Sequence, residues 1–178
     1  MIGHWRLGVL LTFGVLLSDM SFGQGRSQTA PGFTEAQIKA AFIVHLTSFV
    51  AWPDNAPATV ICLAERDDTF GALESLLKNK ADRGLTLKEL DPLSPKAGCD
   101  VLYFNAERAD ENWGSLPASV LLIGDRVGFA EADGMVELRR VSNRIRLLVN
   151  PVNIENGGLK ASSRLLSLAT VVGEEAGQ

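Results

Sequence analysis

Histidine is the side chain that enzymes use most often for proton transfer, and this sequence of 178 residues contains two. One lies in the opening residues, and the other, His45, lies within residues 38–53, IKAAFIVHLTSFVAWP. A hydrolase triad requires a histidine that a carboxylate orients towards a nucleophile. His45 instead falls within an apolar stripe of a predicted helix, which favours a half-buried structural histidine over a catalytic base.

The remaining chemical groups give no recognisable active site. Four carboxylates lie close together in the sequence, at Asp125, Glu131, Asp133 and Glu137. They lack the alternate-residue spacing and the terminal glutamate of a calcium loop, so a solvated turn is predicted. Residues 124–129, GDRVGF, resemble a phosphate loop only loosely, because no helix with a dinucleotide signature follows. No GxSxG, HExxH or GxxxxGK[ST] motif occurs.

The cysteines, Cys62 and Cys99, are the only two in the chain. With one histidine beyond the opening residues, they serve a zinc site poorly, since such sites combine several cysteine and histidine ligands. The sequence therefore predicts no catalytic residue, no cofactor and no metal site, and we expect the protein not to be an enzyme.

The first 23 residues are typical of a secretory signal peptide. Arg6 precedes an apolar run at residues 7–17, and small residues at Ser21 and Gly23 place the predicted cut after Gly23. We expect a periplasmic protein whose residues 24–33 form a flexible leader and whose residues 174–178 form a disordered tail. The alternative is an uncleaved N-terminal anchor. The net charge is −4 without a lysine or arginine run, which argues against nucleic acid and anionic membrane surfaces as partners.

Export permits a disulfide between the two cysteines, although two buried free thiols are the alternative. Cys62 lies inside a predicted strand, and Cys99 immediately precedes another. If these strands are near neighbours, the two Cα atoms can come within the distance that a disulfide requires.

The elements predicted from apolar periodicity alternate between strands and helices, which is typical of an α/β sheet. Residues 34–173 are predicted to form one domain: a mixed sheet with helices on both faces and a C-terminal antiparallel hairpin followed by a helix. The predicted helices cover residues 34–51, 69–79, 107–113 and 159–171, with a short one after Asn150-Pro151, and the predicted strands cover residues 59–64, 85–90, 100–105, 119–123, 134–141 and 144–149.

The first predicted helix is apolar on more than one side. One face, expected to pack on the sheet, comprises Ile38, Ala41, Phe42, His45, Phe49 and Trp52. A second apolar flank comprises Ile43, Leu46 and Val50. This flank either packs on the last helix or forms a contact surface for a partner or a second copy.

Six segments in order resemble the YfiR family of small periplasmic proteins: IKAAFIVHLTSFVAWP, the strand carrying Cys62, Phe70-Gly71, the CDVL at residues 99–102, IGDRVGFAEADGMVEL with RIRLLVN, and GLKASSRLLSLA. The resemblance covers about residues 36–172. It implies a non-enzymatic regulator that binds the periplasmic domain of an inner-membrane diguanylate cyclase or sensor kinase and, for a cyclase, keeps cyclic-di-GMP low. It also implies a Cys62–Cys99 disulfide that makes the fold sensitive to redox conditions.

Two hypotheses of function follow. In the first, the protein binds and represses a membrane signalling protein, with Ile43, Leu46, Val50 and Phe129 as candidate contacts to the partner or within a homodimer. In the second, it is a small-molecule sensor or a transport or kinase accessory protein whose pocket lies at residues 124–134. His45 and Ser48 stand where family members commonly carry asparagine and lysine, which leaves the partner's identity open.

Overall fold

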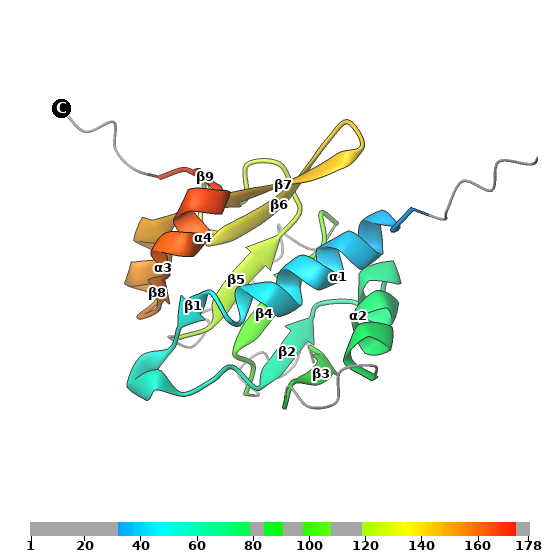
Figure 1. Ribbon diagram of the computed structural model, residues 1–178, viewed down its shortest axis with the longest axis horizontal. Coiled ribbons are helices and arrows are strands. Elements are labelled where there is room, and N and C mark those ends of the chain that lie inside the picture. The colour runs from blue at the N-terminus through cyan, green and yellow to red at the C-terminus, as the bar shows by residue number, and fades with distance from the viewer. Residues whose placement is uncertain (1–31, 79–83, 91–97, 108–118, 174–178) are drawn as a thin grey trace, which may run out of the picture. The chain divides into compact units, whose positions relative to one another are not determined.

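In a computed structural model, the chain folds into a mixed α/β domain, described here over residues 32–78, 84–90, 98–107 and 119–173. Figure 1 shows the α-helices packed against a twisted sheet. The helices are α1 (Glu35–Leu46), α2 (Asp68–Lys78), α3 (Pro151–Asn156) and α4 (Ser163–Leu168), with a 3-10 turn at Pro53–Asn55. The strands are β1 (Val50–Ala51), β2 (Val60–Leu63), β3 (Thr86–Glu89), β4 (Val101–Phe104), β5 (Leu121–Gly124), β6 (Val136–Val141), β7 (Arg144–Val149), β8 (Lys160–Ala161) and β9 (Thr170–Val171).

The main sheet has seven strands in the order β3-β2-β4-β5-β6-β7-β9. Strands β3, β2, β4, β5 and β6 run parallel, β7 is antiparallel to β6, and β9 is parallel to β7. The predicted mixed sheet, the single domain and the hairpin followed by a helix are therefore confirmed. The expected helices on both faces are not found among the described residues, where all four α-helices contribute to the same apolar cluster. The predicted helix at residues 107–113 lies almost entirely outside the described residues.

Helix α1 begins as predicted but ends earlier. Thr34 and Gln37 form a capping box, in which each side chain accepts a hydrogen bond from the other's backbone N–H. The prediction that the helix continues to residue 51 was wrong. Thr47 donates its hydroxyl to the carbonyl of Val44, and the chain turns into β1, which pairs antiparallel with β8. A strand partner more than a hundred residues away thus overrides the local helical pattern.

The last predicted helix is also shorter than expected. Residues 159–171 form β8, α4 and β9 rather than one helix. The Ser162 side chain accepts from the N–H of Leu165, and this N-cap fixes where α4 begins. The β-branched residues Thr170 and Val171 then pair with β7, as β-branched residues favour strands.

Two apolar clusters lie on opposite faces of the sheet. Alternate residues of a strand point to opposite faces of the sheet. On one face, Ile61, Tyr103 and Ile123 of the parallel strands belong to the larger cluster. All four described α-helices contribute buried residues to this cluster, at Ile43 in α1, Leu73 in α2, Ile154 in α3 and Leu165 in α4 among others. The smaller cluster comprises Cys62, Ala64, Leu90, Leu102, Phe104, Val120 and Phe129.

Candidate functional site

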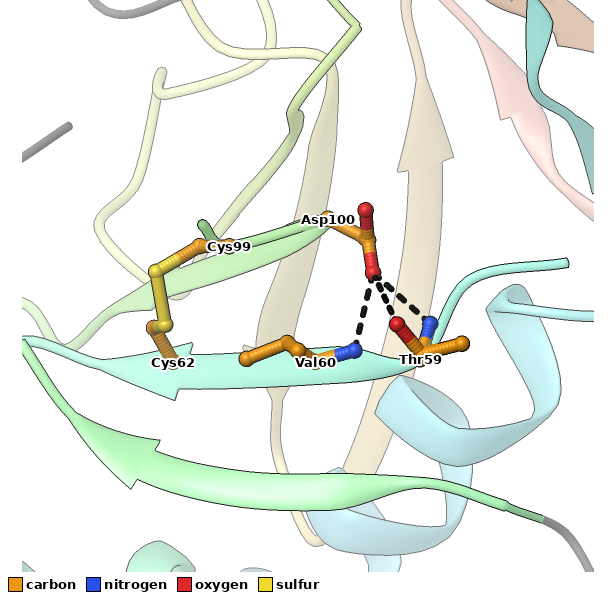
Figure 2. The surroundings of a disulfide bond; sticks show 5 residues. All are labelled: Thr59, Val60, Cys62, Cys99 and Asp100. Carbon is orange, nitrogen blue, oxygen red and sulfur yellow. Dashed lines mark hydrogen bonds between the residues drawn. A yellow bond between two sulfur atoms is a disulfide. The ribbon is translucent and has the colours of Figure 1, made fainter. Parts of the chain in front are cut away.

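A disulfide and a set of hydrogen bonds link strand β2 to the start of strand β4. Cys62 and Cys99 form a disulfide whose Cα atoms lie 5.8 Å apart, as the sequence predicted. Next to it, Asp100 accepts three hydrogen bonds through Oδ2: from the N–H of Thr59 (2.7 Å), the hydroxyl of Thr59 (3.1 Å) and the N–H of Val60 (2.8 Å). Figure 2 shows the covalent and the hydrogen-bonded link side by side. The consecutive residues Cys99 and Asp100 therefore anchor β4 to β2, the strand that precedes α2.

The candidate contact residues of the second helical flank are buried rather than on the surface. Ile43, Leu46 and Val50 have exposed fractions of 0%, 1% and 6% and belong to the main core. The expectation that this flank offers a contact surface is therefore corrected: in the folded domain, it packs inwards. Phe129 is also buried, at 7% exposed.

The opposite flank of α1 forms an open groove with α2. The groove has a volume of about 970 Å³, and its wall is mainly apolar. Its lining includes Ile38, Ala41 and Phe42, which were expected to pack on the sheet, and the exposed His45 at the rim. The prediction for this face is therefore right for Trp52, Phe42 and Phe49, which lie in or against the main core. It is wrong for Ile38, Ala41 and His45, and the apolar surface that a partner can reach is the one beside α2.

Small side chains keep this groove open. They are Ala36, Ala40 and Ala41 on α1 and Gly71, Ala72 and Ser75 on α2. The small residues of both helices are visible in the sequence. The prediction missed the groove because it did not place α1 and α2 face to face. The size of these small residues leaves a hollow where larger side chains would close the contact.

The Phe129 ring packs against Gly124 and Gly134 in the turn at residues 124–134. A Cβ atom placed on Gly124 would lie 2.7 Å from the Phe129 ring, so only glycine fits against the ring without a shift. Asn150 donates a hydrogen bond to the carbonyl of Ala130 (2.9 Å). Asn153 donates to the carbonyls of Ala132 and Gly134 (both 2.8 Å), and these bonds hold the turn in place. Phe129 thus occupies space at the turn where the sensor hypothesis expected a ligand pocket.

Of the four carboxylates near this turn, Glu137 is buried and Asp125 is half-buried, which corrects the prediction of a solvated turn. Asp125 accepts from Lys39 Nζ (2.6 Å) and from the Tyr103 hydroxyl (2.7 Å), and its side chain is 10% exposed. Burial raises the pKa of Tyr103, and the charge of Asp125 raises it further. Burial would lower the pKa of Lys39, but Asp125 and Glu35 outweigh it, so this pKa is raised. The ammonium therefore stays charged and ties α1 to the end of β5.

The buried carboxylate, Glu137, is also neutralised by a cation of the chain. Glu137 is fully buried, accepts from the N–H of Ala130 at 3.2 Å and pairs with Arg139 Nε at 2.5 Å. Hydrogen bonding to Glu137 raises the pKa of Arg139. Within the described residues, no group of three or more histidine, cysteine, aspartate or glutamate side chains is arranged to hold a metal ion. These carboxylates are structural partners of cations already present in the chain.

Comparison with known proteins places this geometry in a family. The family model described as YfiR/HmsC-like matches residues 36–170. The chain belongs to the YfiR/HmsC-like family. The family resemblance in the sequence is thereby confirmed. No functionally curated protein matches this YfiR/HmsC-like chain significantly.

Solved structures support the fold of this YfiR/HmsC-like protein. A conserved domain protein from Vibrio cholerae O1 biovar El Tor str. N16961 is similar, with a TM-score of 0.50 and 15% identity over 79% of this chain. The ABC domain in complex with L-Trp from Streptococcus pneumonia has a TM-score of 0.45 and 13% identity over 77% of this chain. This chain spans 60% of the length of each of these structures. At such identities, the first shows the fold alone, and the second carries no argument.

In the part of the chain that the structure describes, none of the helices combines the length and apolar character that crossing a bilayer requires. The groove, the disulfide and the buried ion pairs are thus the features on which a function of this YfiR/HmsC-like protein can be argued.

Proposed function

We propose that this protein is a non-enzymatic regulator that acts in the periplasm. It binds the periplasmic sensory domain of an inner-membrane signalling protein, represses a diguanylate cyclase and so lowers cyclic-di-GMP. The observation that carries the proposal is the YfiR/HmsC-like family match over residues 36–170. Export through the signal peptide at residues 1–23, with a cut after Gly23, is part of the same proposal.

The groove between α1 and α2 supports a binding role. Large apolar hollows that remain open on a folded surface are typical of sites where a ligand or a partner docks. Phe33, at the lip of the groove, is 83% exposed, so apolar surface continues beyond the hollow. In this proposal the groove replaces the buried flank of Ile43, Leu46 and Val50 as the contact surface.

Deletion of the gene tests the regulatory role. Without the repressor, cyclic-di-GMP and biofilm formation should rise, and the wild-type gene supplied in trans should restore both. Unchanged cyclic-di-GMP in the deletion strain would reject repression of a cyclase.

A pair of matched variants tests the groove. Ala41→Glu places a charge in the groove and should leave the protein folded but unable to repress, because a charge desolvated without a partner is costly. Ala51→Glu makes the same chemical change at an exposed position of β1 and should repress normally. Full repression by folded Ala41→Glu protein would show that the partner binds elsewhere. Leu46→Glu is expected to unfold the protein, because Leu46 is core.

A further inference from the structure

The β6–β7 hairpin extends beyond the rest of the sheet. Strand β6 pairs with β5 only at Val136 and Glu137, and β7 pairs with β9 only at Leu148 and Val149. In the four residue pairs nearer the tip, β6 and β7 pair with each other and with no third strand among those described. Figure 1 shows this part of the hairpin projecting past its neighbours. We name residues 138–147 the arm.

The arm carries four arginines in eight residues: Arg139, Arg140, Arg144 and Arg146. Arg139 pairs with Glu137 and Glu131, and Arg140 pairs with Glu35 at 3.3 Å.

Arg144 and Arg146 are exposed, and neither forms an ion pair within the described part of the chain. Two unpaired guanidinium groups therefore stand together on a protein whose net charge is −4.

The register of the arm puts like charges against each other. Arg139 lies directly opposite Arg146, and Val141 lies opposite Arg144. Because alternate residues share a face of a strand, these four side chains lie on one side of the arm. The like charges of Arg139 and Arg146 lie directly opposite each other, which destabilises an antiparallel pair, and a two-stranded ribbon has little stability to spare. Glu137 and Glu131 offset the charge of Arg139 but not that of Arg146. An anion bound at Arg146 and Arg144 would relieve this repulsion.

The arm also adjoins the groove. A smaller hollow of about 290 Å³ lies between the start of α1 and the arm. Phe33, Glu35 and Ile38 line both hollows, and Arg140, Asn143, Arg144 and Ile145 complete the smaller one. A partner seated in the groove can therefore reach Arg144 through the smaller hollow. Arg146 lies on the face of the arm turned away from α1, because its neighbours Ile145 and Leu147 pack on the main core.

We propose that the arm docks a carboxylate-bearing surface of the partner's periplasmic domain through Arg144 and Arg146. This inference rests on the proposed function and names the chemistry of its partner. Guanidinium groups match carboxylates in a two-pronged geometry, which gives register as well as attraction. A membrane surface is the weaker fit, because lipid recognition uses larger basic clusters, and the net negative charge opposes approach to anionic lipid.

The test measures binding of the exported protein to the purified periplasmic domain of each inner-membrane diguanylate cyclase of the native host. Arg144→Glu with Arg146→Glu should weaken binding at least about tenfold and should flatten its dependence on salt. Arg144→Ala with Arg146→Ala should weaken it less, and it should fold at least as stably as wild type because the repulsion is removed. The matched control, Lys78→Glu with Lys88→Glu, changes the net charge equally and should bind within about twofold of wild type.

Wild-type affinity in both arm variants would overturn this inference and leave the proposed function intact. No binding by the wild type would refute the proposed function and the inference with it. Vesicles of 7:3 phosphatidylcholine and phosphatidylglycerol, about 30% anionic, provide a second probe. Vesicle binding that the arm variants lose, while they keep the periplasmic domain, would overturn the inference in favour of a membrane surface. A dimer that the variants dissociate, with partner affinity unchanged, would overturn it in favour of a second copy.

Discussion

Removing the Cys62–Cys99 disulfide should cost this domain a large part of its stability. The two cysteines are 37 residues apart in the sequence. Closing a loop of that length removes unfolded-state entropy worth about 4 kcal/mol in the chain-entropy model. Small domains have a net stability of about 5–15 kcal/mol. In a domain of this size, each kcal/mol shifts the melting temperature by about 2–4 °C, so a fall of about 8–16 °C is expected.

Two perturbations separate the cross-link from the packing of its atoms. Reduction of wild-type protein breaks the bond but leaves both sulfur atoms in place. Cys62→Ala with Cys99→Ala also removes atoms at Cys62, which is 1% exposed, so this variant should be somewhat less stable than the reduced wild type. Asp100→Ala is the control for the neighbouring hydrogen bonds. Its three partners are exposed or half-buried, so water replaces much of the loss, and about 1–2 kcal/mol is expected.

Urea unfolding followed by circular dichroism, with and without reductant, measures these differences. Thiol titration of freshly purified, denatured protein should find no free thiol. Two titratable thiols, or a reduced protein within about 1 kcal/mol of the oxidised one, would refute the argument from loop closure.

Two further predictions concern buried groups. The pKa of Tyr103 is raised in the folded state, so its contribution to stability is present below the ordinary tyrosine pKa of about 10 and is lost as pH rises above it. Tyr103→Phe loses the hydrogen bond to Asp125 and should be less stable at pH 7. In urea unfolding, this variant should lose stability less steeply than wild type between pH 9 and 11, about the range where the unfolded tyrosine titrates, and an equally steep fall would contradict this. Gly124→Ala should be destabilised by about 1–3 kcal/mol because its Cβ meets the Phe129 ring, and Phe129→Ala should remove most of this added cost in a double-mutant cycle, whereas strictly additive losses would show that the ring is not the obstacle.

Local signals in the sequence predicted local structure well. The capping box at Thr34 and Gln37 fixed the start of α1, and Asn150 before Pro151 fixed the start of α3. Both signals work through hydrogen bonds or backbone angles within a few residues. The ends of α1 and of the last helix depend instead on the pairing of β1 with β8 and of β9 with β7, which the local pattern does not contain.

The surface was harder to predict than the sheet. Apolar residues surround α1 on several sides, so periodicity did not decide whether Phe42 or Leu46 faces the core. The arginine arm was missed for a different reason. Arg139 and Arg146 are seven positions apart, and only the hairpin register places them opposite each other. A search for runs of basic residues therefore finds only the pair Arg139-Arg140, although the folded surface carries a basic face.

The C-terminal strands have a consequence for the order in which the molecule can assemble. Residues 160–161 complete the pairing of β1, near the start of the domain, and residues 170–171 complete the edge beside β7. A chain that emerges N-terminus first, whether from the ribosome or from the export channel of the proposed function, lacks the partner of β1 until residue 161 has emerged and the partner of β7 until residue 171 has emerged. Domains otherwise tend to fold as they emerge, N-terminal parts first. Here the last residues of the domain, in β8 and β9, complete the pairing of β1 and of β7, so these two pairings form last.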